Sequence, residues 1–276
     1  MSELEGKVAL VTGGARGQGR SHALALAAAG AAVVVCDIAA QIPSVPYPMA
    51  TREDLDETVA MIEKAGGRAT ASVTDVRDGA AVSDLTERVV RQHGRLDILI
   101  ANAGITSFYQ VADIPDAVWS DTLAVNLTGA FHCIRAALPH MAGQRYGRIV
   151  AISSGAGRSG MPNLGHYGAS KWGLIGLIKT VAAETARQGI TANVVCPTTV
   201  NTPMVVNDRT FALFAPDIEH PTADDVRPRM AATNPMGEPW IEPEDVTRAV
   251  MYLVTDPGRT SGAVLEVSLG MSAART

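Results

Sequence analysis

The sequence predicts an α/β protein built on one doubly wound parallel sheet of about seven strands, with helices on both faces. Apolar runs of strand length alternate with amphipathic segments of helix length along most of the chain. Each run is apolar throughout rather than at every second residue, which is typical of strands that are covered on both faces. With 276 residues and 47% hydrophobic content, a single domain over residues 1–276 can bury a large core.

Strands and helices follow one another in a regular order. Runs rich in valine, isoleucine and alanine predict strands at residues 7–12, 32–37, 68–76, 96–101, 147–153, 191–197 and 263–268. The segments between them predict helices at residues 19–30, 52–65, 80–93, 117–140, 167–188 and 242–254. Acidic residues mark helix starts, as where Glu244 and Asp245 follow Pro243. Residues 38–51 and 201–240 interrupt the alternation and are too long for ordinary connections.

Composition argues against several classes of protein. The net charge of −5 comes with scattered lysines and arginines, so we expect no nucleic-acid partner. The sequence has no uninterrupted apolar run of 18 residues, so we expect no membrane partner. Its acidic start is unlike a signal peptide, which favours a cytoplasmic location. The three cysteines and the six histidines do not have the spacing of metal ligands, so we expect no metal site. The cysteines are expected to be buried thiols.

A glycine-rich loop at residues 12–19 lies directly between the first predicted strand and the first predicted helix. Glycines allow a tight turn there and let backbone N–H groups approach a pyrophosphate at the helix N-terminus, as in Rossmann-type dinucleotide-binding folds. An ordinary strand-to-helix turn is the alternative, but the strand-loop-helix context favours the cofactor. The residues expected to contact it are Gly13, Arg16, Gly17, Gln18 and Gly19.

Asp37 ends the second predicted strand, about twenty residues after the loop. A carboxylate there can accept hydrogen bonds from both ribose hydroxyls of an adenosine and repels a 2′-phosphate, so the cofactor is expected to be NAD, with Ile38 beside it. Arg16 could instead attract that phosphate. We give Asp37 more weight and interpret Arg16 as a solvated loop residue.

Two further strands end in polar or small residues. Asp75 and Val76 lie at the carboxyl end of the third predicted strand, and Asn102, Ala103 and Gly104 follow the fourth. Ligands bind at this edge of an open parallel sheet, so these residues are expected to shape the adenine side of the site. The alternative is that Asp75 caps a turn and Asn102 satisfies backbone groups.

Three polar side chains are placed to act on a carbonyl or alcohol oxygen. Tyr167 and Lys171 are four residues apart, on one face of a predicted helix, and Ser154 precedes the tyrosine by thirteen residues. A tyrosine with a pKa near ~10 needs about 3 to 4 kcal/mol to act as a base near neutrality. An ammonium at about 4 Å supplies on the order of 4 kcal/mol at an effective dielectric of ~20, so one lysine is expected to suffice. Ser154 can donate to the substrate oxygen.

Taken together and in this order, these motifs resemble the short-chain dehydrogenase/reductase family over essentially the whole chain. The resemblance adds Asn126, which in the family holds a water that relays protons past Lys171; a purely structural amide is the alternative. It also implies a nicotinamide side formed by Pro197, Val200, Thr202 and Met204, hydride transfer to or from NAD, and a homotetramer. Pro197 is followed by threonine, where most of the family has glycine.

Residues 37–51, 162–167 and 197–204 resemble a narrower branch, the mycofactocin-coupled oxidoreductases that include carveol dehydrogenases. That branch also has threonine after Pro197. The resemblance implies an NAD that stays bound and is reoxidised by mycofactocin, a small peptide-derived redox cofactor, which would act as the external electron acceptor.

The two long segments are expected to cover the site. Residues 38–51 contain three prolines and present apolar surface through Ile42, Val45, Tyr47 and Met49, and we expect them to form a lid over tightly bound NAD. Residues 201–240 are expected to form a lid over a small lipophilic alcohol or ketone, with core packing or a subunit contact as alternatives. Their apolar residues include Met204, Phe211, Leu213, Phe214, Met230, Met236 and Trp240.

The expected function is the interconversion of a lipophilic secondary alcohol, such as a terpenoid, and its ketone. An epimerase of the extended type also uses a Tyr-x-x-x-Lys pair, but it would need a different glycine spacing and a longer C-terminal sugar domain. A non-catalytic NAD-sensing protein would be expected to have lost one of the three polar side chains, and all three are present.

Overall fold

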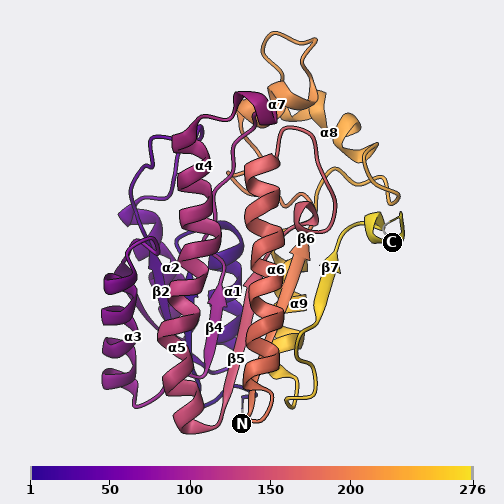
Figure 1. The fold of residues 1–276 in the computed structure, drawn as a ribbon. Helices are drawn as coiled ribbons and strands as arrows, with labels where there is room; N and C mark the ends of the chain where they lie inside the picture. Colours follow the sequence, from indigo (N-terminus) through magenta and orange to yellow (C-terminus); the bar gives the residue numbers. More distant parts are fainter. Residues whose placement is uncertain (1, 275–276) are drawn as a thin grey trace.

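The computed structural model describes residues 2–274, so residue 1 and residues 275–276 of the expected domain lie outside the described range. Within it, one sheet contains seven strands in the order β3-β2-β1-β4-β5-β6-β7, and every neighbouring pair is parallel (Figure 1). The strands are β1 (Val8–Thr12), β2 (Ala32–Asp37), β3 (Arg68–Val73), β4 (Ile98–Ala101), β5 (Gly147–Ile152), β6 (Ile190–Pro197) and β7 (Val264–Val267).

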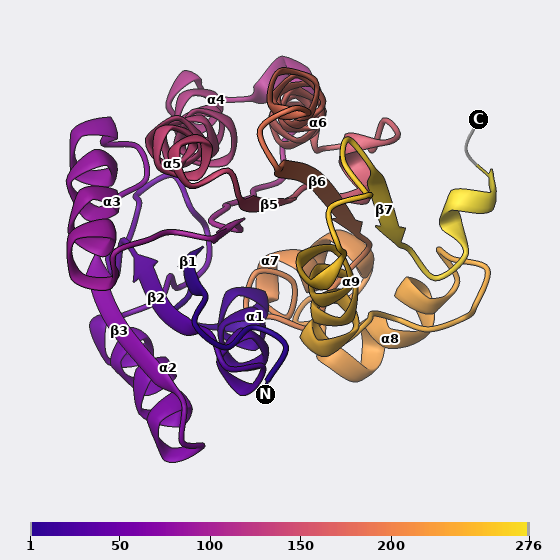
Figure 2. The same ribbon diagram turned by 90° about the horizontal axis from the view of Figure 1, so that it is seen from below.

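Helices cover both faces of the sheet, which confirms the predicted doubly wound fold. Figure 2 shows α3, α4, α5 and α6 on one face and α1, α2 and α9 on the other. Their bounds are α1 (Gly17–Ala28), α2 (Arg52–Lys64), α3 (Gly79–His93), α4 (Asp116–Leu123), α5 (Ala130–Gln144), α6 (Gly165–Thr185) and α9 (Pro243–Thr255). No helix in the described range is both long enough and apolar enough to cross a membrane.

The core is divided by the sheet into two apolar clusters. Val8 and Leu10 of β1 belong to the cluster under α3, α5 and α6, whereas Ala9 and Val11 belong to the cluster under α1 and α9. Successive side chains of a strand point to opposite faces, so a strand that is apolar throughout serves both clusters. The three cysteines are buried and free, as expected.

The structure differs from the predicted elements in two places. The expected helix at residues 117–140 runs from α4 into α5 through a π-helical turn at Ala124–Gly129. Residues 201–240 contain two short helices, α7 (Asp208–Phe214) and α8 (Ala223–Ala231). In Figure 1 these two helices lie beyond the carboxyl ends of the strands. They have a small apolar cluster of their own, formed by Phe211, Ala215, Val226, Met230 and Trp240.

The strand order reverses between β1 and β4. From β1 the chain proceeds to β2 and β3 on one side, and from β4 to β5, β6 and β7 on the other. The connections therefore diverge at the carboxyl ends of these two strands and leave a crevice there, which is where open α/β sheets bind ligands.

Candidate active site

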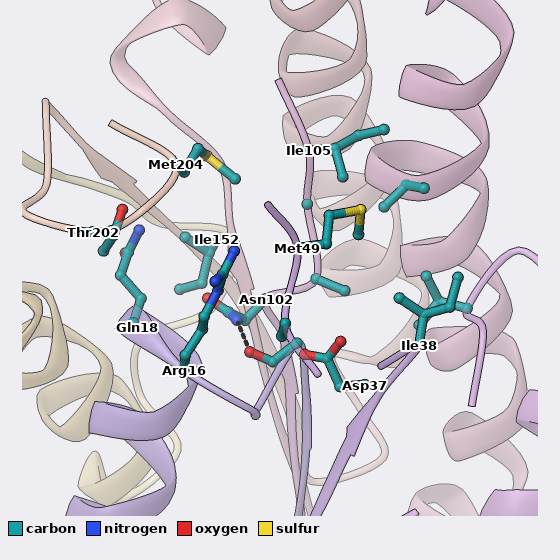
Figure 3. A pocket seen from close by; sticks show the side chains of 18 of the residues that line it. Arg16, Gln18, Asp37, Ile38, Met49, Asn102, Ile105, Ile152, Thr202 and Met204 are labelled. Carbon is teal, nitrogen blue, oxygen red and sulfur yellow. Dashed lines mark hydrogen bonds between the residues drawn. The ribbon is translucent and has the colours of Figure 1, made fainter. Parts of the chain in front are cut away.

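One cavity at this crevice brings together most of the residues expected to bind the cofactor. It encloses about 1050 Å³ when its mouth to solvent is counted. The expected residues that line it are Gly13, Arg16, Gly17, Gln18, Gly19, Asp37, Ile38, Asp75, Val76, Asn102, Ala103, Gly104, Tyr167, Lys171, Thr202 and Met204. Figure 3 shows Gln18 and Arg16 from the glycine loop on one side and Ile38 and Met49 on the other.

The glycine loop has no room for side chains on the backbone that faces the cavity. A Cβ on Gly19 would lie 2.0 Å from the carbonyl oxygen of Gly13, and Gly17 has a φ of +57°. Asn102 holds the loop against β4, because its Nδ2 donates to the carbonyl oxygens of Thr12 and Gly13 at 2.9 and 3.2 Å (Figure 3). The loop therefore presents bare backbone at a helix N-terminus, which fits a pyrophosphate.

The adenosine side of the cavity fits an unphosphorylated ribose. Asp37 ends β2 and accepts hydrogen bonds from the backbone N–H groups of Ala15 and Ala39 at 3.3 and 3.2 Å. Burial raises the pKa of Asp37, and these hydrogen bonds oppose the rise.

On the glycine loop, the Oε1 atom of Gln18 is buried without a hydrogen-bond partner among the described residues. An unsatisfied acceptor beside bare backbone is what a ligand with donor groups would complete.

Arg16, which the sequence analysis interprets as a solvated loop residue, is half-buried and makes one contact that the sequence did not predict. Its guanidinium donates to the carbonyl oxygen of Pro48, in the segment of residues 38–51. The side chain thus links the glycine loop to that segment across the mouth of the cavity. A guanidinium held in this way is less available to a 2′-phosphate.

Residues 38–51 form a wall of the cofactor cavity. Ile42, Tyr47, Met49 and Ala50 line it, and Ile42 and Tyr47 are only 2% and 7% exposed. Inside the segment, Gln41 Nε2 donates to the carbonyl oxygens of Ile42 and Val45 at 3.1 and 3.0 Å, and its Oε1 accepts from the N–H of Met49 at 3.0 Å. The segment is therefore a folded unit with its own hydrogen bonds.

A chain of polar contacts, here called the tip clasp, joins this segment to the adenine side of the site. The hydroxyl of Ser44 donates to Asp121 of α4 at 2.6 Å, Asp121 accepts from Arg77 at 3.0 Å, and Arg77 donates to both carboxylate oxygens of Asp75 at 3.1 and 2.9 Å. Burial alone would raise the pKa of Asp75, but the hydrogen bonds from Arg77 lower it. Sequence reasoning missed Ser44, Arg77 and Asp121, and no local motif marks them.

The three polar side chains expected to act on the substrate oxygen lie near one another, and Tyr167 and Lys171 line the same cavity. Burial raises the pKa of Tyr167 to about 12, against a hydrogen bond from Ser154 that favours the phenolate. Lys171 is buried one helical turn later, and burial lowers its pKa to about 8. Its ammonium donates to the carbonyl oxygen of Ile152 at 2.8 Å and lies 5.6 Å from the centre of the Tyr167 ring. Tyr167, Ser154 and Lys171 are thus brought together as the sequence predicts.

Asn126 lies in the π-helical turn and is 1% exposed. Its Oδ1 accepts from the N–H of Ile105 at 2.8 Å, and its Nδ2 donates to the carbonyl oxygen of Ile105 at 3.0 Å and to Ser170 Oγ at 3.1 Å. The side-chain amide therefore fastens the chain beyond β4 to α6. Turns of this kind are frequent at functional sites, and the expected role in a proton relay stays a prediction.

The nicotinamide side is partly as expected. Thr202, Pro203 and Met204 line the cavity, whereas Pro197 at the end of β6 and Val200 in the core are not among its lining residues. Phe211, Met230 and Trp240 pack on one another instead of facing the cavity, which is the core-packing alternative for this segment. Met236 is 68% exposed.

Comparison with known proteins agrees with this geometry. The model of the short chain dehydrogenase family matches residues 7–212. (−)-trans-Carveol dehydrogenase of Rhodococcus erythropolis is 42% identical over 273 residues, which cover 98% of this chain and 99% of that protein. The crystal structure of carveol dehydrogenase from Mycobacterium avium in complex with NAD has a TM-score of 0.95 and 42% identity, covering 98% of this chain and 99% of the other. A short chain dehydrogenase from Mycobacterium paratuberculosis bound to NAD has a TM-score of 0.88 and 38% identity, covering 97% and 98%. The chain belongs to the short-chain dehydrogenase family.

Proposed function

We propose that this NAD-dependent alcohol dehydrogenase interconverts a lipophilic secondary alcohol and its ketone with an NAD that stays bound between turnovers. The observation that carries the proposal is the position of residues 38–51, which form a wall of the cofactor cavity and are fastened to its two sides. One fastening is the contact of Arg16 with Pro48, and the other is the tip clasp. The remaining residues of the site supply the chemistry.

Each polar group at the reaction centre has a role in this chemistry. NAD, when bound, would supply the hydride acceptor for alcohol oxidation. Tyr167 takes the hydroxyl proton of the substrate and returns it in ketone reduction, while Ser154 donates to the same oxygen as negative charge develops on it. Lys171 carries its positive charge within 5.6 Å of the Tyr167 ring and favours the phenolate.

Opening the wall is costly enough to slow cofactor release. Ile42, Val45 and Tyr47 are nearly fully buried, and exposing each would cost about 1.5 to 3 kcal/mol. Breaking the hydrogen bonds of Arg16 and Ser44 adds to this cost. Each 1.4 kcal/mol slows release about tenfold, so an NAD held for many minutes is the expected result.

The proposal extends to the identity of the substrate and of the electron acceptor. Met204 and Pro203 give the cavity an apolar border beyond Thr202, which suits a neutral, lipophilic alcohol. The similarity to two proteins named carveol dehydrogenase favours a terpenoid alcohol. A retained NAD needs an external acceptor for its electrons, and we propose mycofactocin for that role because of the sequence resemblance described above.

We also propose a homotetramer in the cytoplasm, on the same family resemblance. Three large apolar side chains remain exposed on the helices of one face: Trp119 at 42%, Phe131 at 39% and Trp172 at 50%. They would become buried in contacts between subunits. Sedimentation velocity of the purified protein tests the assembly, and a monomer at micromolar concentration would contradict it.

The main experiment separates retention from ordinary exchange. Purified protein is passed through a desalting column, its bound nucleotide is counted, and carveol is added. We expect about one NAD per chain, a single round of reduction to NADH, and repeated turnover only with an artificial electron acceptor. Steady release of NADH with free NAD as the sole oxidant would refute both the retention and the external acceptor.

Ser44→Ala provides a matched variant for the retention. It removes the first hydrogen bond of the tip clasp and no residue that lines the cavity. We expect NAD release to become roughly five- to tenfold faster, because about 1 kcal/mol of a partly exposed, charge-assisted hydrogen bond is lost. The rate of the single hydride-transfer step should stay within twofold of the wild type.

A further inference from the structure

Tyr47 brings a second phenol into the cavity that Tyr167 lines. It belongs to residues 38–51 rather than to the sheet, and its hydroxyl accepts a hydrogen bond from the N–H of Thr106 at 3.3 Å. Thr106 lies just beyond the Asn102–Gly104 turn that follows β4. The side chain of Tyr47 thus connects residues 38–51, which follow Asp37, to the chain beyond β4. That stretch of chain belongs to the part of the site nearer the reaction centre.

The hydroxyl of Tyr47 is a proton donor at neutral pH. Burial raises its pKa, and electrostatic interaction with Tyr167 raises it further. A phenol has one proton to donate, and its oxygen already accepts from Thr106. Within residues 2–274 that proton has no acceptor. Because Tyr47 lines the cofactor cavity, a ligand bound there would supply the acceptor for this proton.

We propose that Tyr47 donates this hydrogen bond to an oxygen atom of the nicotinamide ribose of bound NAD. The inference rests on the proposed function, in which NAD occupies this cavity. The substrate is the poorer acceptor, because a secondary alcohol has one oxygen and that oxygen is served by Ser154 and Tyr167. A ribose offers several oxygens. Tyr47 would then be the residue through which the wall recognises the reactive half of the cofactor.

A truncated ligand distinguishes this role from a purely structural one. Nucleotide is removed from the protein with charcoal, and the binding of NAD and of ADP, which lacks the nicotinamide ribose, is measured by calorimetry. Tyr47→Phe keeps the ring and its packing but removes the hydroxyl. We expect the variant to bind NAD roughly tenfold more weakly and ADP within twofold of the wild type.

Two control variants complete the comparison. Ser44→Ala loosens the tip clasp without touching Tyr47, and we expect it to weaken NAD and ADP by the same factor. Tyr252→Phe removes a phenol that is 59% exposed on α9, and it should change neither affinity. If Tyr47→Phe weakened both ligands equally, its role would be structural, as with Ser44→Ala, and the inference would be wrong.

The remaining outcomes also decide the question. Unchanged affinity for both ligands would overturn the inference, and so would normal NAD affinity combined with a raised KM for the alcohol, which would assign the hydroxyl to the substrate. If the wild type lost NAD on a desalting column while Tyr47→Phe still weakened NAD selectively, the proposed retention would fail and the role of Tyr47 would stand.

Discussion

Replacing Lys171 with methionine should shift the pH dependence of alcohol oxidation upward by about 2 pH units. The ammonium lies 5.6 Å from the centre of the Tyr167 ring. At an effective dielectric of ~20, a charge at that distance stabilises a phenolate by about 3 kcal/mol, which corresponds to about 2 units of pKa. Methionine has a similar length and no charge, so it removes this interaction with little change in packing.

The assay follows a single turnover of the enzyme with NAD bound. NADH absorbance after mixing with alcohol gives the hydride-transfer rate from pH 5 to pH 10, and the midpoint of its rise with pH reports the deprotonation of Tyr167. Each preparation is corrected for its content of bound NAD, because the lysine also lines the cofactor cavity. Lys179→Met, on an exposed position of the same helix, is the control and should keep the wild-type midpoint.

A variant with the wild-type midpoint would refute this reasoning. It would mean that Lys171 does not stabilise the phenolate, and that its charge serves only to bind the cofactor. A shift much larger than 2 units would instead indicate a closer approach of the ammonium to the phenol oxygen once NAD is bound.

Three further predictions test other parts of the site. Tyr167→Phe should retain NAD and fold normally while hydride transfer falls by about 10²- to 10⁴-fold, measured by single turnover; comparable activity would exclude Tyr167 as the base. Asp37→Ala should weaken NAD by roughly tenfold and reduce discrimination against NADP, measured by calorimetry, whereas a wild type that binds both equally would contradict the preference for NAD. In the cofactor-free protein the pKa of Lys171 is lowered from 10.5 to about 8 by burial, so between these values the unfolded chain holds more protons and raising the pH favours the folded state. Urea unfolding should therefore show the wild type gaining up to ~3 kcal/mol relative to Lys171→Met between pH 8 and pH 10.5, and parallel pH curves would argue against a buried ammonium.

The fold and the central motifs were predictable because their signals are local. An apolar run such as residues 7–12 indicates a strand buried on both faces without reference to the rest of the chain. The glycine loop lies directly between a strand and a helix, and Tyr167 and Lys171 are one helical turn apart. Short sequence distance and regular backbone geometry together determine these positions.

The contacts that fasten residues 38–51 could not be predicted in the same way. Arg16 and Pro48 are 32 residues apart, and Ser44 and Asp121 are 77 apart. Their contacts depend on the path of an irregular segment whose hydrogen bonds are made by Gln41. Likewise, an apolar residue such as Phe211 packs equally well on its neighbours or on a substrate, and only the structure shows that it joins Met230 and Trp240.

The covered cavity changes the electrostatic argument for catalysis. From the sequence, one lysine about 4 Å from a tyrosine with a pKa near ~10 would suffice to form a phenolate at neutral pH. In the structure burial raises the pKa of Tyr167 to about 12, so a phenolate is harder to form at neutral pH than this reasoning assumes. Lys171, 5.6 Å from the centre of the ring, supplies about 3 kcal/mol, which is less than a charge at about 4 Å would supply.

Positive charge on the bound cofactor would add to the stabilisation that Lys171 supplies. An oxidised nicotinamide ring carries such a charge, and a reduced ring does not. The same burial that raises the pKa of Tyr167 also excludes water and strengthens the interaction between that ring and the phenolate. The pKa of Tyr167 should thus be lower with NAD bound than with NADH bound. The phenol is then a base when an alcohol is to be oxidised and an acid when a ketone is to be reduced, so a wall that retains the cofactor also adjusts the proton donor to the oxidation state of that cofactor.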